Sequence, residues 1–310
     1  MTAHQYELLE SIPDLRALTR AIIVGTLPVV GTKHVAANDP TSRLEVRGIS
    51  IDRSDLASYT RATGLRLGNE LPPTYPFVIG FPITMELMSR PDFPFAPTGA
   101  VHVANVIEQE RALRVDETFT FRLHAENLRP HRRGLLIDIV TEVSVDGSDE
   151  DKPVWRQRAT MLAQGAKFDR SAPVSVSTRK RDDARMLPRP EVPDVASNAQ
   201  WAWTRDNVRA YVAASGDANP IHTSKLGAKA FGFPSIIAHG MYSAASVLQL
   251  LEGTLGGALT YAVEFHKPVV IPARVAAWAI GEGEGATAIQ LRSASKPEKL
   301  HLNARVERRP

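Results

Sequence analysis

Two segments of the chain repeat one local pattern, and this repeat constrains the fold more than any other feature. Residues 51–59 lie over residues 203–211 at an offset of 152, and at the same offset Gly64 lies over Gly216. A repeat of this length is typical of a chain built from similar units. The sequence therefore predicts two related halves, each containing one copy of the repeated segment.

Each copy of the repeat carries the start and stop signals of a short helix. Asp52 and Thr204 are N-cap candidates, an acidic residue follows in the first turn, and a glycine ends each segment. Apolar positions recur at i and i+3, as one buried helix face requires. They are Leu56 and Tyr59 in the first copy and Val208 and Tyr211 in the second. We expect two short helices that end in matched turns.

An apolar run follows each repeat, and strand patterns follow each run. Residues 77–88 and 236–251 are apolar almost all round, which is typical of a helix in the middle of a fold. Beyond each run, apolar residues alternate with polar ones, as in antiparallel strands that are covered on one face. The predicted strands span residues 101–107, 118–124, 137–145, 154–162, 259–265, 273–281 and 300–306. The sequence predicts an α+β protein whose antiparallel sheets wrap around the apolar helices.

Chain length and composition fit this two-part organisation. The 310 residues are enough for two ordinary cores, and 43% hydrophobic with 23% charged residues is the balance of a folded globular protein. Residues 169–200 hold few apolar side chains and several prolines, so we interpret them as a linker along the surface. The predicted units are therefore residues 1–168 and residues 201–310.

Composition also limits the partners and the setting. The chain has no cysteine, which excludes disulfides and cysteine-ligated metals and fits a reducing, cytoplasmic setting. Its 37 basic and 34 acidic residues leave a net charge of +3, which does not favour a nucleic-acid partner. The apolar run at residues 21–30 is too short to span a membrane, and we interpret it as a helix end packed on the core. We interpret the acidic residues 149–151 as an exposed hairpin tip.

The strongest chemical signal directly follows the second repeat. Residues 216–222 read Gly-Asp-Ala-Asn-Pro-Ile-His, and residues 238–240 read Ala-His-Gly at the start of the second apolar run. Gly-Asp-x-Asn-Pro alone is a tight turn, because Asp and Asn tolerate strained backbone and Pro fixes the exit. A turn does not require the histidine, however. A carboxylate beside an imidazole can hold and deprotonate water, and a free N–H at a helix start stabilises a negative carbonyl oxygen. These groups predict addition or loss of water beside a polarised carbonyl.

The combination of both motifs closely resembles the signature of the R-specific enoyl-CoA hydratases and MaoC-like dehydratases. The resemblance is strong from residue 203 to residue 251 and looser beyond. It implies the hot-dog fold, in which a curved antiparallel sheet wraps a long helix. For this chain it implies two tandem hot-dog units, of which residues 201–310 form the catalytic one.

The resemblance also assigns roles to four residues. It implies that Asp217 and His222 form the catalytic pair, that Asn219 supports the site through hydrogen bonds, and that the Gly240 amide is the oxyanion donor. His239 is left open, because it could shape the site or simply begin the helix. The remaining histidines lack metal-ligand spacing and no nucleotide-binding loop is recognised, so we expect no metal and no cofactor.

The first copy of the repeat lacks the reactive groups. At the same offset Asp217 falls on Leu65, Asn219 on Leu67 and His222 on Glu70, and with a six-residue gap Gly240 falls on Pro82. Pro has no N–H to donate. We therefore interpret residues 1–168 as a degenerate hot-dog unit without catalytic activity.

The expected reaction is reversible syn hydration of a trans-2-enoyl thioester to the (3R)-hydroxyacyl thioester, in fatty-acid metabolism. Which member of the Asp217 and His222 pair acts as the base stays open, because the two groups titrate together. The acyl carrier, coenzyme A or acyl carrier protein, also stays open, as does assembly into a homodimer or heteromer. Lys267 and Arg274 are weak candidates for contacts with coenzyme A phosphates. The alternative is a non-catalytic acyl-thioester-binding subunit of a dehydratase complex.

Overall fold

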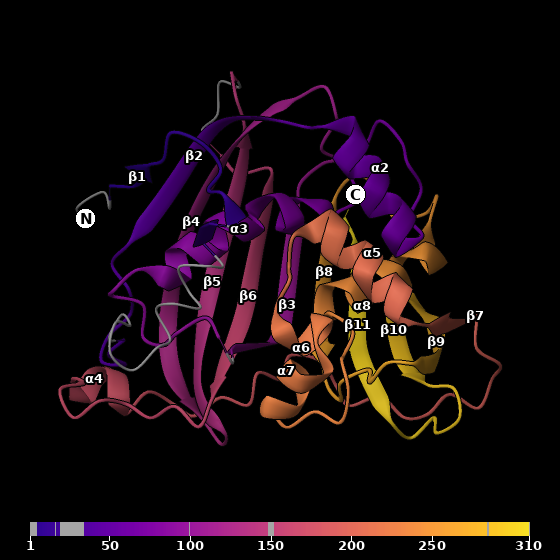
Figure 1. Cartoon of the computed structure of the whole chain (residues 1–310). Coiled ribbons are helices and arrows are strands. Elements are labelled where there is room, and N and C mark those ends of the chain that lie inside the picture. Colours follow the sequence, from indigo (N-terminus) through magenta and orange to yellow (C-terminus); the bar gives the residue numbers. More distant parts are fainter. Residues whose placement is uncertain are drawn as a thin grey trace. The chain divides into compact units, whose positions relative to one another are not determined.

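The computed structural model describes residues 5–15, 17–18, 34–98, 100–147, 152–283 and 285–309 (Figure 1). The chain divides into two compact units. Unit 1 comprises the residues up to Ser50, Ile79–Val103 and Glu117–Ala184, and unit 2 comprises Ile51–Val78, Ala104–Asp116 and the residues from Arg185 onward. Each unit is assembled from several separate stretches of the sequence. The two units therefore differ from the hot-dog units predicted with boundaries at residues 168 and 201, and those boundaries stay a prediction.

Unit 1 is an antiparallel sheet with the end of one long helix. Its strands lie in the order β1-β2-β4-β5-β6, and all neighbours are antiparallel except β1 and β2. Helix α3 (Tyr75–Ser89) runs into this unit, where Gly80 lies against Phe121 and Thr141 of the sheet. The strands are β1 (Glu7–Leu8), β2 (Arg43–Ser50), β4 (Thr118–His131), β5 (Gly134–Val145) and β6 (Trp155–Gln164), and a short helix α4 (Val174–Ser177) follows them.

Strand β5 is buried on both faces, so the prediction of a strand covered on one face is wrong here. Asp138 points to the face opposite to Ile137 and Ile139 and is 1% exposed. Its carboxylate accepts hydrogen bonds from Thr160 at 2.7 Å and from Asn127 at 2.9 Å, and Arg129 lies 3.0 Å away. Arg129 in turn donates to Asp182 at 2.7 Å. A buried polar network, supplied partly by the segment after β6, therefore covers the outer face.

Unit 2 holds most of the helices and a second antiparallel ladder. The strand order is β3-β8-β11-β10-β9-β7, with every neighbour antiparallel, and β3 begins in unit 1 before it joins this ladder. The strands are β3 (Ala100–Gln109), β7 (Ala199–Trp203), β8 (Leu259–Phe265), β9 (Ala273–Gly283), β10 (Ala286–Ser293) and β11 (Leu300–Arg308). The helices are α2 (Arg53–Thr63), α5 (Arg205–Ser215), α6 (Pro220–Thr223), α7 (Lys225–Ala230), α8 (Gly240–Val247) and a 3₁₀ turn, η1 (Leu248–Leu251).

The two repeat segments form matched helices, as predicted. Asp52 caps α2 and Thr204 caps α5 through their side chains, and each helix ends at a glycine in the left-handed region, Gly64 at φ 76° and Gly216 at φ 73°. The predicted apolar positions are buried in both helices, and the rings of Tyr59 and Tyr211 lie 6.3 Å apart. Figure 1 shows α2 and α5 near one another within unit 2.

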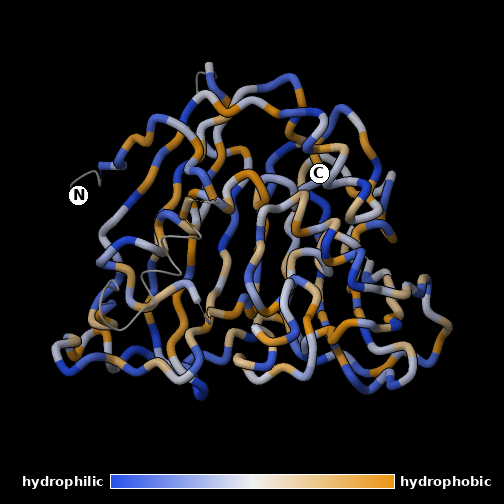
Figure 2. Tube along the Cα trace, in the orientation of Figure 1, coloured by the Kyte–Doolittle hydropathy of each residue, from blue (hydrophilic) through white to orange (hydrophobic). Residues whose placement is uncertain are grey.

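The second apolar run forms a shorter helix than residues 236–251 predict. Ile236, Ile237 and Ala238 are extended, because their main chain bonds to the segment from Val269 to Ile271. Helix α8 therefore begins only at Gly240 and gives way to η1 after eight residues. All seven predicted strands are present, whereas β1, β2, β7 and β10 were not predicted. Figure 2 shows hydrophobic positions recurring along the strands.

Part of the predicted linker is bound to the outer face of the unit 2 sheet. Glu264 on β8, 1% exposed, accepts hydrogen bonds from the main chain of Met186 and Leu187, and Arg185 lies 3.1 Å from its carboxylate. Despite its burial, these donors and His266 lower the pKa of Glu264 to about 2. Farther along, the Asn303 amide donates to the Pro188 carbonyl at 3.0 Å. The segment therefore covers polar side chains that face away from the helices.

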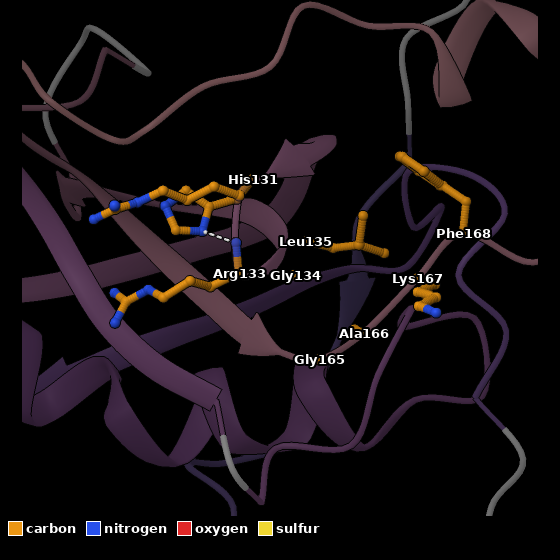
Figure 3. A pocket seen from close by; sticks show the side chains of 9 residues that line it. His131, Arg133, Gly134, Leu135, Gly165, Ala166, Lys167 and Phe168 are labelled. Carbon is orange, nitrogen blue, oxygen red and sulfur yellow. Dashed lines mark hydrogen bonds between the residues drawn. The ribbon is translucent and has the colours of Figure 1, made fainter.

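A shallow cavity of about 480 Å³ lies in unit 1, at the turn between β4 and β5 (Figure 3). Its lining includes His131, Arg133 and Lys167, and the Arg133 main-chain N–H donates to the His131 ring at 3.1 Å.

In the described part of the chain, no helix is long and apolar enough to cross a membrane. The helix end predicted at 21–30 and the hairpin tip predicted at 149–151 lie outside the described residues.

Candidate active site

The turn after α5 is held by the side chains of its own polar residues. The Asp217 main-chain N–H donates to Ser215 Oγ at 3.3 Å, and Asp217 Oδ1 accepts the Asn219 N–H at 3.2 Å. Asn219 Oδ1 then accepts the Ile221 N–H at 3.2 Å and so caps α6, where Pro220 occupies the first turn. The turn therefore positions the Asp217 carboxylate and starts the helix that carries His222.

His222 is buried and its ring orientation is fixed from one edge. Its Nδ1 atom lies 2.7 Å from the main-chain oxygen of Ile237. Because a carbonyl oxygen only accepts, Nδ1 carries the hydrogen, and the neutral ring keeps its lone pair on Nε2. Burial lowers the pKa of His222, with Asp217 and the Ile237 carbonyl acting in the opposite direction. The ring is therefore a neutral proton acceptor.

His239 lies directly against His222. The two rings are stacked with centroids 3.6 Å apart and an angle of 26° between their planes. The Nε2 atom of His239 lies 3.0 Å from the main-chain oxygen of Asp217 and 3.7 Å from its carboxylate oxygen Oδ2. Burial and, to a smaller extent, the neighbouring His222 lower the pKa of His239 to about 3. This residue, which the sequence left open, therefore contacts both members of the predicted pair and stays neutral.

Gly240 provides the first N–H of α8, directly after His239 in the chain. No acceptor for this N–H is found among the described residues, as expected for the first position of a helix. A Cβ atom at this position would lie 3.1 Å from the Phe265 ring, so the close approach of β8 favours glycine. The free N–H and the dipole of α8 together suit an anionic oxygen.

A series of aromatic rings, each in contact with the next, packs against the His239 ring of the histidine pair. Tyr211 of α5 lies 4.9 Å from the His239 ring and 5.4 Å from Tyr242 of α8, and Tyr242 lies 4.7 Å from Trp203 of β7, all measured between centroids. Tyr211 and His239 are fully buried. The sequence placed Tyr211 on the buried face of its helix but gave no signal that this ring supports His239.

Three side chains in the described part of the chain come close enough to suggest a metal ion. Donor atoms of Asp217, His222 and His239 all lie within 4.8 Å of one another. The lone pairs of stacked imidazoles lie in two nearly parallel planes, however, and do not converge on one point. One nitrogen of each ring is also engaged by a main-chain carbonyl. The arrangement fits an acid–base site better than a metal centre.

The structure brings together all four residues that the sequence singled out, within one short stretch of unit 2. The corresponding positions of the first repeat differ: Leu65 is buried, whereas Leu67 and Glu70 are exposed. Pro82 lies in the middle of α3 and not at its start, so the predicted equivalence of Pro82 and Gly240 is wrong. The N–H that begins α3, that of Tyr75, already donates to the Pro72 carbonyl at 2.8 Å. The N–H that begins α3 is therefore engaged, whereas no acceptor for the Gly240 N–H is found among the described residues.

Lys267 and Arg274 lie next to β8 and β9 as expected, but no described contact places either of them at this site. The Lys267 main-chain oxygen lies 2.8 Å from Nδ1 of His301, and the Arg274 main-chain oxygen accepts from Ala294. A role in binding coenzyme A phosphates therefore stays a prediction.

Comparison with known proteins places the chain among thioester dehydratases. A family model described as the MaoC like domain matches residues 164–296. The chain is 41% identical over 292 residues to 3-hydroxyacyl-thioester dehydratase X of Mycobacterium tuberculosis, covering 94% of this chain and 97% of that protein.

Solved structures show the same relationship. The crystal structure of HtdX from M. tuberculosis has a TM-score of 0.72 and 38% identity, covering 86% of this chain and all of that one. A MaoC-like dehydratase from Phytophthora capsici has a TM-score of 0.67 and 18% identity, over 88% of this chain and 96% of that chain. The similarity to the Phytophthora capsici protein concerns the fold alone.

Proposed function

The chain belongs to the MaoC-like dehydratase family, and we propose that its active site consists of Asp217, His222 and the Gly240 amide, supported by Asn219. The protein is a hydro-lyase that acts on 3-hydroxyacyl thioesters in fatty-acid metabolism. The proposed reaction is reversible syn addition of water to a trans-2-enoyl thioester, giving the (3R)-hydroxyacyl thioester. The observation that carries the site assignment is the proximity of the Asp217 carboxylate to the neutral imidazoles of His222 and His239, the second of which directly precedes the helix-start N–H of Gly240.

We infer that His222 acts as the proton acceptor for water. Its Nδ1–H is committed to the Ile237 carbonyl, so only Nε2 can receive a proton. In the hydration direction, the water oxygen bonds to C3 while one water proton passes to Nε2. A proton from the Asp217 and His222 pair is then delivered to C2, which restores the pair and balances the reaction. Asp217 orients the water through its carboxylate.

The Gly240 N–H is proposed to stabilise the thioester oxygen. Attack at C3 moves negative charge through the conjugated system onto that oxygen, which then resembles an enolate. A single main-chain donor at such a position typically contributes about 3 kcal/mol to the transition state.

The proposal includes a tandem pair of hot-dog units in which residues 201–310 supply the reactive groups. Its support is the repeated pair of helices, α2 and α5, together with the absence of the reactive side chains from the first copy. The proposed site residues act on the acyl end of the substrate, which is the same for both carriers. The proposal therefore includes either coenzyme A or an acyl carrier protein as the acyl carrier.

The test is an assay with trans-2-enoyl-CoA of short, medium and long chain, following the loss of conjugated-enoyl absorbance and measuring free thiol in parallel. Asp217→Asn and His222→Ala should each lower kcat by about a hundredfold or more, because each removes a group that handles protons. Glu70→Gln is the matched control from the first repeat and should retain the activity of the unaltered enzyme.

Three outcomes would contradict the proposal. Binding of the thioester without hydration at any chain length would favour the non-catalytic binding subunit. A large loss of activity in Glu70→Gln, with the fold intact by circular dichroism, would contradict the assignment of the first repeat as degenerate. Release of free thiol without hydration would identify a thioesterase instead.

A further inference from the structure

We propose that His239 is a positioning residue, which holds Asp217 and His222 in their mutual geometry through an Nε2–H donor and through its ring face. The inference rests on the proposed function and names a residue that the resemblance left without a role. His239 is 2% exposed, so solvent contact does not explain its polarity. A buried imidazole that contacts two reacting groups requires a more specific explanation than packing.

The position of His239 at the start of α8 does not explain why it is a histidine. His239 is the N-cap residue of this helix, yet its side chain makes no capping hydrogen bond. Ser, Thr, Asp or Asn at an N-cap stabilises a helix by about 1 kcal/mol relative to residues that do not cap. Helix stability alone would therefore favour another residue. The His239 side chain instead extends to the turn after α5, 22 residues earlier in the chain.

The Nε2–H of His239 fixes the main chain of Asp217. Its acceptor is the Asp217 carbonyl oxygen at 3.0 Å, which identifies Nε2 as the protonated nitrogen of the neutral ring. On the other side of the residue, the Asp217 N–H is held by Ser215 Oγ at 3.3 Å. These two bonds restrain both peptide units that flank Asp217, and Asn219 restrains the carboxylate itself. Loss of the His239 donor would release one of the three restraints.

The ring face of His239 fixes the plane of His222. The bond from His222 Nδ1 to the Ile237 carbonyl holds one edge of that ring but leaves rotation about the bond free. Stacking at 3.6 Å removes this rotation, so Nε2 points in one direction only. Tyr211 lies against His239 at 4.9 Å and keeps it in place. The stack therefore determines where the proton acceptor points.

The neutrality of His239 suits this role. The titratable residues that face it are His222 through its ring, Asp217 through its carboxylate and Tyr211 through its ring. A positive charge on His239 would repel the imidazolium that forms when His222 accepts a proton. Because burial holds the pKa of His239 at about 3, the ring carries no such charge at neutral pH. His222 can therefore gain a proton without a cationic neighbour.

Two substitutions of His239 test its hydrogen-bond donor and its stacking ring separately. His239→Gln places an amide N–H near the former Nε2 but removes the aromatic face, whereas His239→Phe keeps a stacking ring and removes the donor. His301→Gln is the matched control, because His301 is also buried and its Nδ1 lies 2.8 Å from a main-chain oxygen, that of Lys267. His301 lies on β11, and no contact among the described residues joins it to Asp217, His222 or His239.

The variants are assayed as full-length protein with a trans-2-enoyl-CoA that the unaltered enzyme hydrates. We expect kcat to fall about tenfold to a hundredfold in both His239 variants, the loss typical of a reacting group displaced by about 1 Å, with KM changed by less than about threefold. The acid limb of kcat/KM should also shift, since the surroundings of His222 change. His301→Gln should keep both kcat and the acid limb, even where its Tm falls as much as that of the His239 variants.

Unchanged kcat and an unchanged acid limb in both folded His239 variants would overturn the inference. A loss of kcat that His301→Gln matches at equal Tm would overturn it as well, because the effect would then be general destabilisation. Failure of the proposed function is distinguishable from both, since in that case the unaltered enzyme itself would not hydrate the enoyl thioester.

Discussion

At the scale of single residues, the two stacked histidines are protonated on different nitrogens for a structural reason. The main-chain oxygen of Ile237 selects the Nδ1–H form of His222, and the main-chain oxygen of Asp217 selects the Nε2–H form of His239. One imidazole thus presents a lone pair at the site while its neighbour acts only as a donor. Side-chain identity alone does not determine this difference, because it arises from the carbonyl that each ring meets.

The lowered pKa of His222 predicts a pH dependence of activity. The proton acceptor must start unprotonated, and burial moves its pKa below the ordinary value of 6.5. Activity should therefore persist as the pH falls through 6.5 and decline only when the pH passes below the lowered pKa. The measurement is kcat/KM against pH with a trans-2-enoyl-CoA, corrected for the folded fraction at each pH. An acid limb centred above 6.5 would contradict a buried His222 as the base.

At the scale of elements, the start of α8 combines two requirements in Gly240. The N–H must be free to donate, and the Phe265 ring of β8 leaves little room for a side chain. Glycine in this position does not need an unusual backbone, because it begins an ordinary helix. Its small size and its amide can therefore be tested independently.

Comparison of Gly240→Pro with Gly240→Ala tests the role of the amide N–H separately from the role of the missing side chain. Both variants add a Cβ atom against Phe265, but only Pro removes the N–H, and Pro is well tolerated at the first position of a helix. The His239 backbone, at φ −63° and ψ 143°, is compatible with a following proline. We expect kcat of Gly240→Pro to lie about a hundredfold below that of Gly240→Ala in the enoyl-CoA assay, as for loss of one oxyanion donor. Equal kcat values in the two variants would show that this amide does not act on the substrate.

The repeat helices and their turns were predictable because local signals determine them. Asp52, Thr204, Gly64 and Gly216 act through bonds to their own helix ends, and the structure confirms each of these positions. The burial of β5 on both faces was not predictable, since Asp138 finds its partners on other strands. Covering of the β8 outer face by residues 185–188 likewise depends on contacts far apart in sequence.

The candidate site shows the same division between local and distant information. The spacing of Asp217, Asn219 and His222 predicted that one turn brings them together. In the structure Asp217 and Asn219 lie in that turn, and His222 lies in α6, which Asn219 caps. The stacking of His239 on His222 depends on the extended segment before α8, whose register is set by Val269 and Val270. No periodicity within residues 236–251 indicates that bridge, because apolar residues suit both a strand and a helix.

At the scale of the whole molecule, one chain is expected to provide one reactive centre, although its repeat provides two similar helices. The first copy retains the cap, the buried ring of Tyr59 and the left-handed Gly64. At the positions of Asp217 and His222 it has Leu65 and Glu70 instead, and the N–H that begins α3 is engaged. The scaffold of the turn therefore does not by itself require the reactive side chains.

Titration of the enzyme with a saturated acyl-CoA, which cannot be hydrated, should give one binding site per chain. The thioester oxygen of this probe needs a free helix-start N–H. Among the described residues the N–H that begins α8 has no acceptor, whereas the N–H that begins α3 is engaged by Pro72. Isothermal titration calorimetry measures the ratio directly, and Gly240→Pro should weaken binding of the same probe, whereas Glu70→Gln should bind it as the unaltered enzyme does. A stoichiometry of two sites per chain would mean that the first repeat also binds a thioester, by contacts other than those of Asp217, His222 and Gly240.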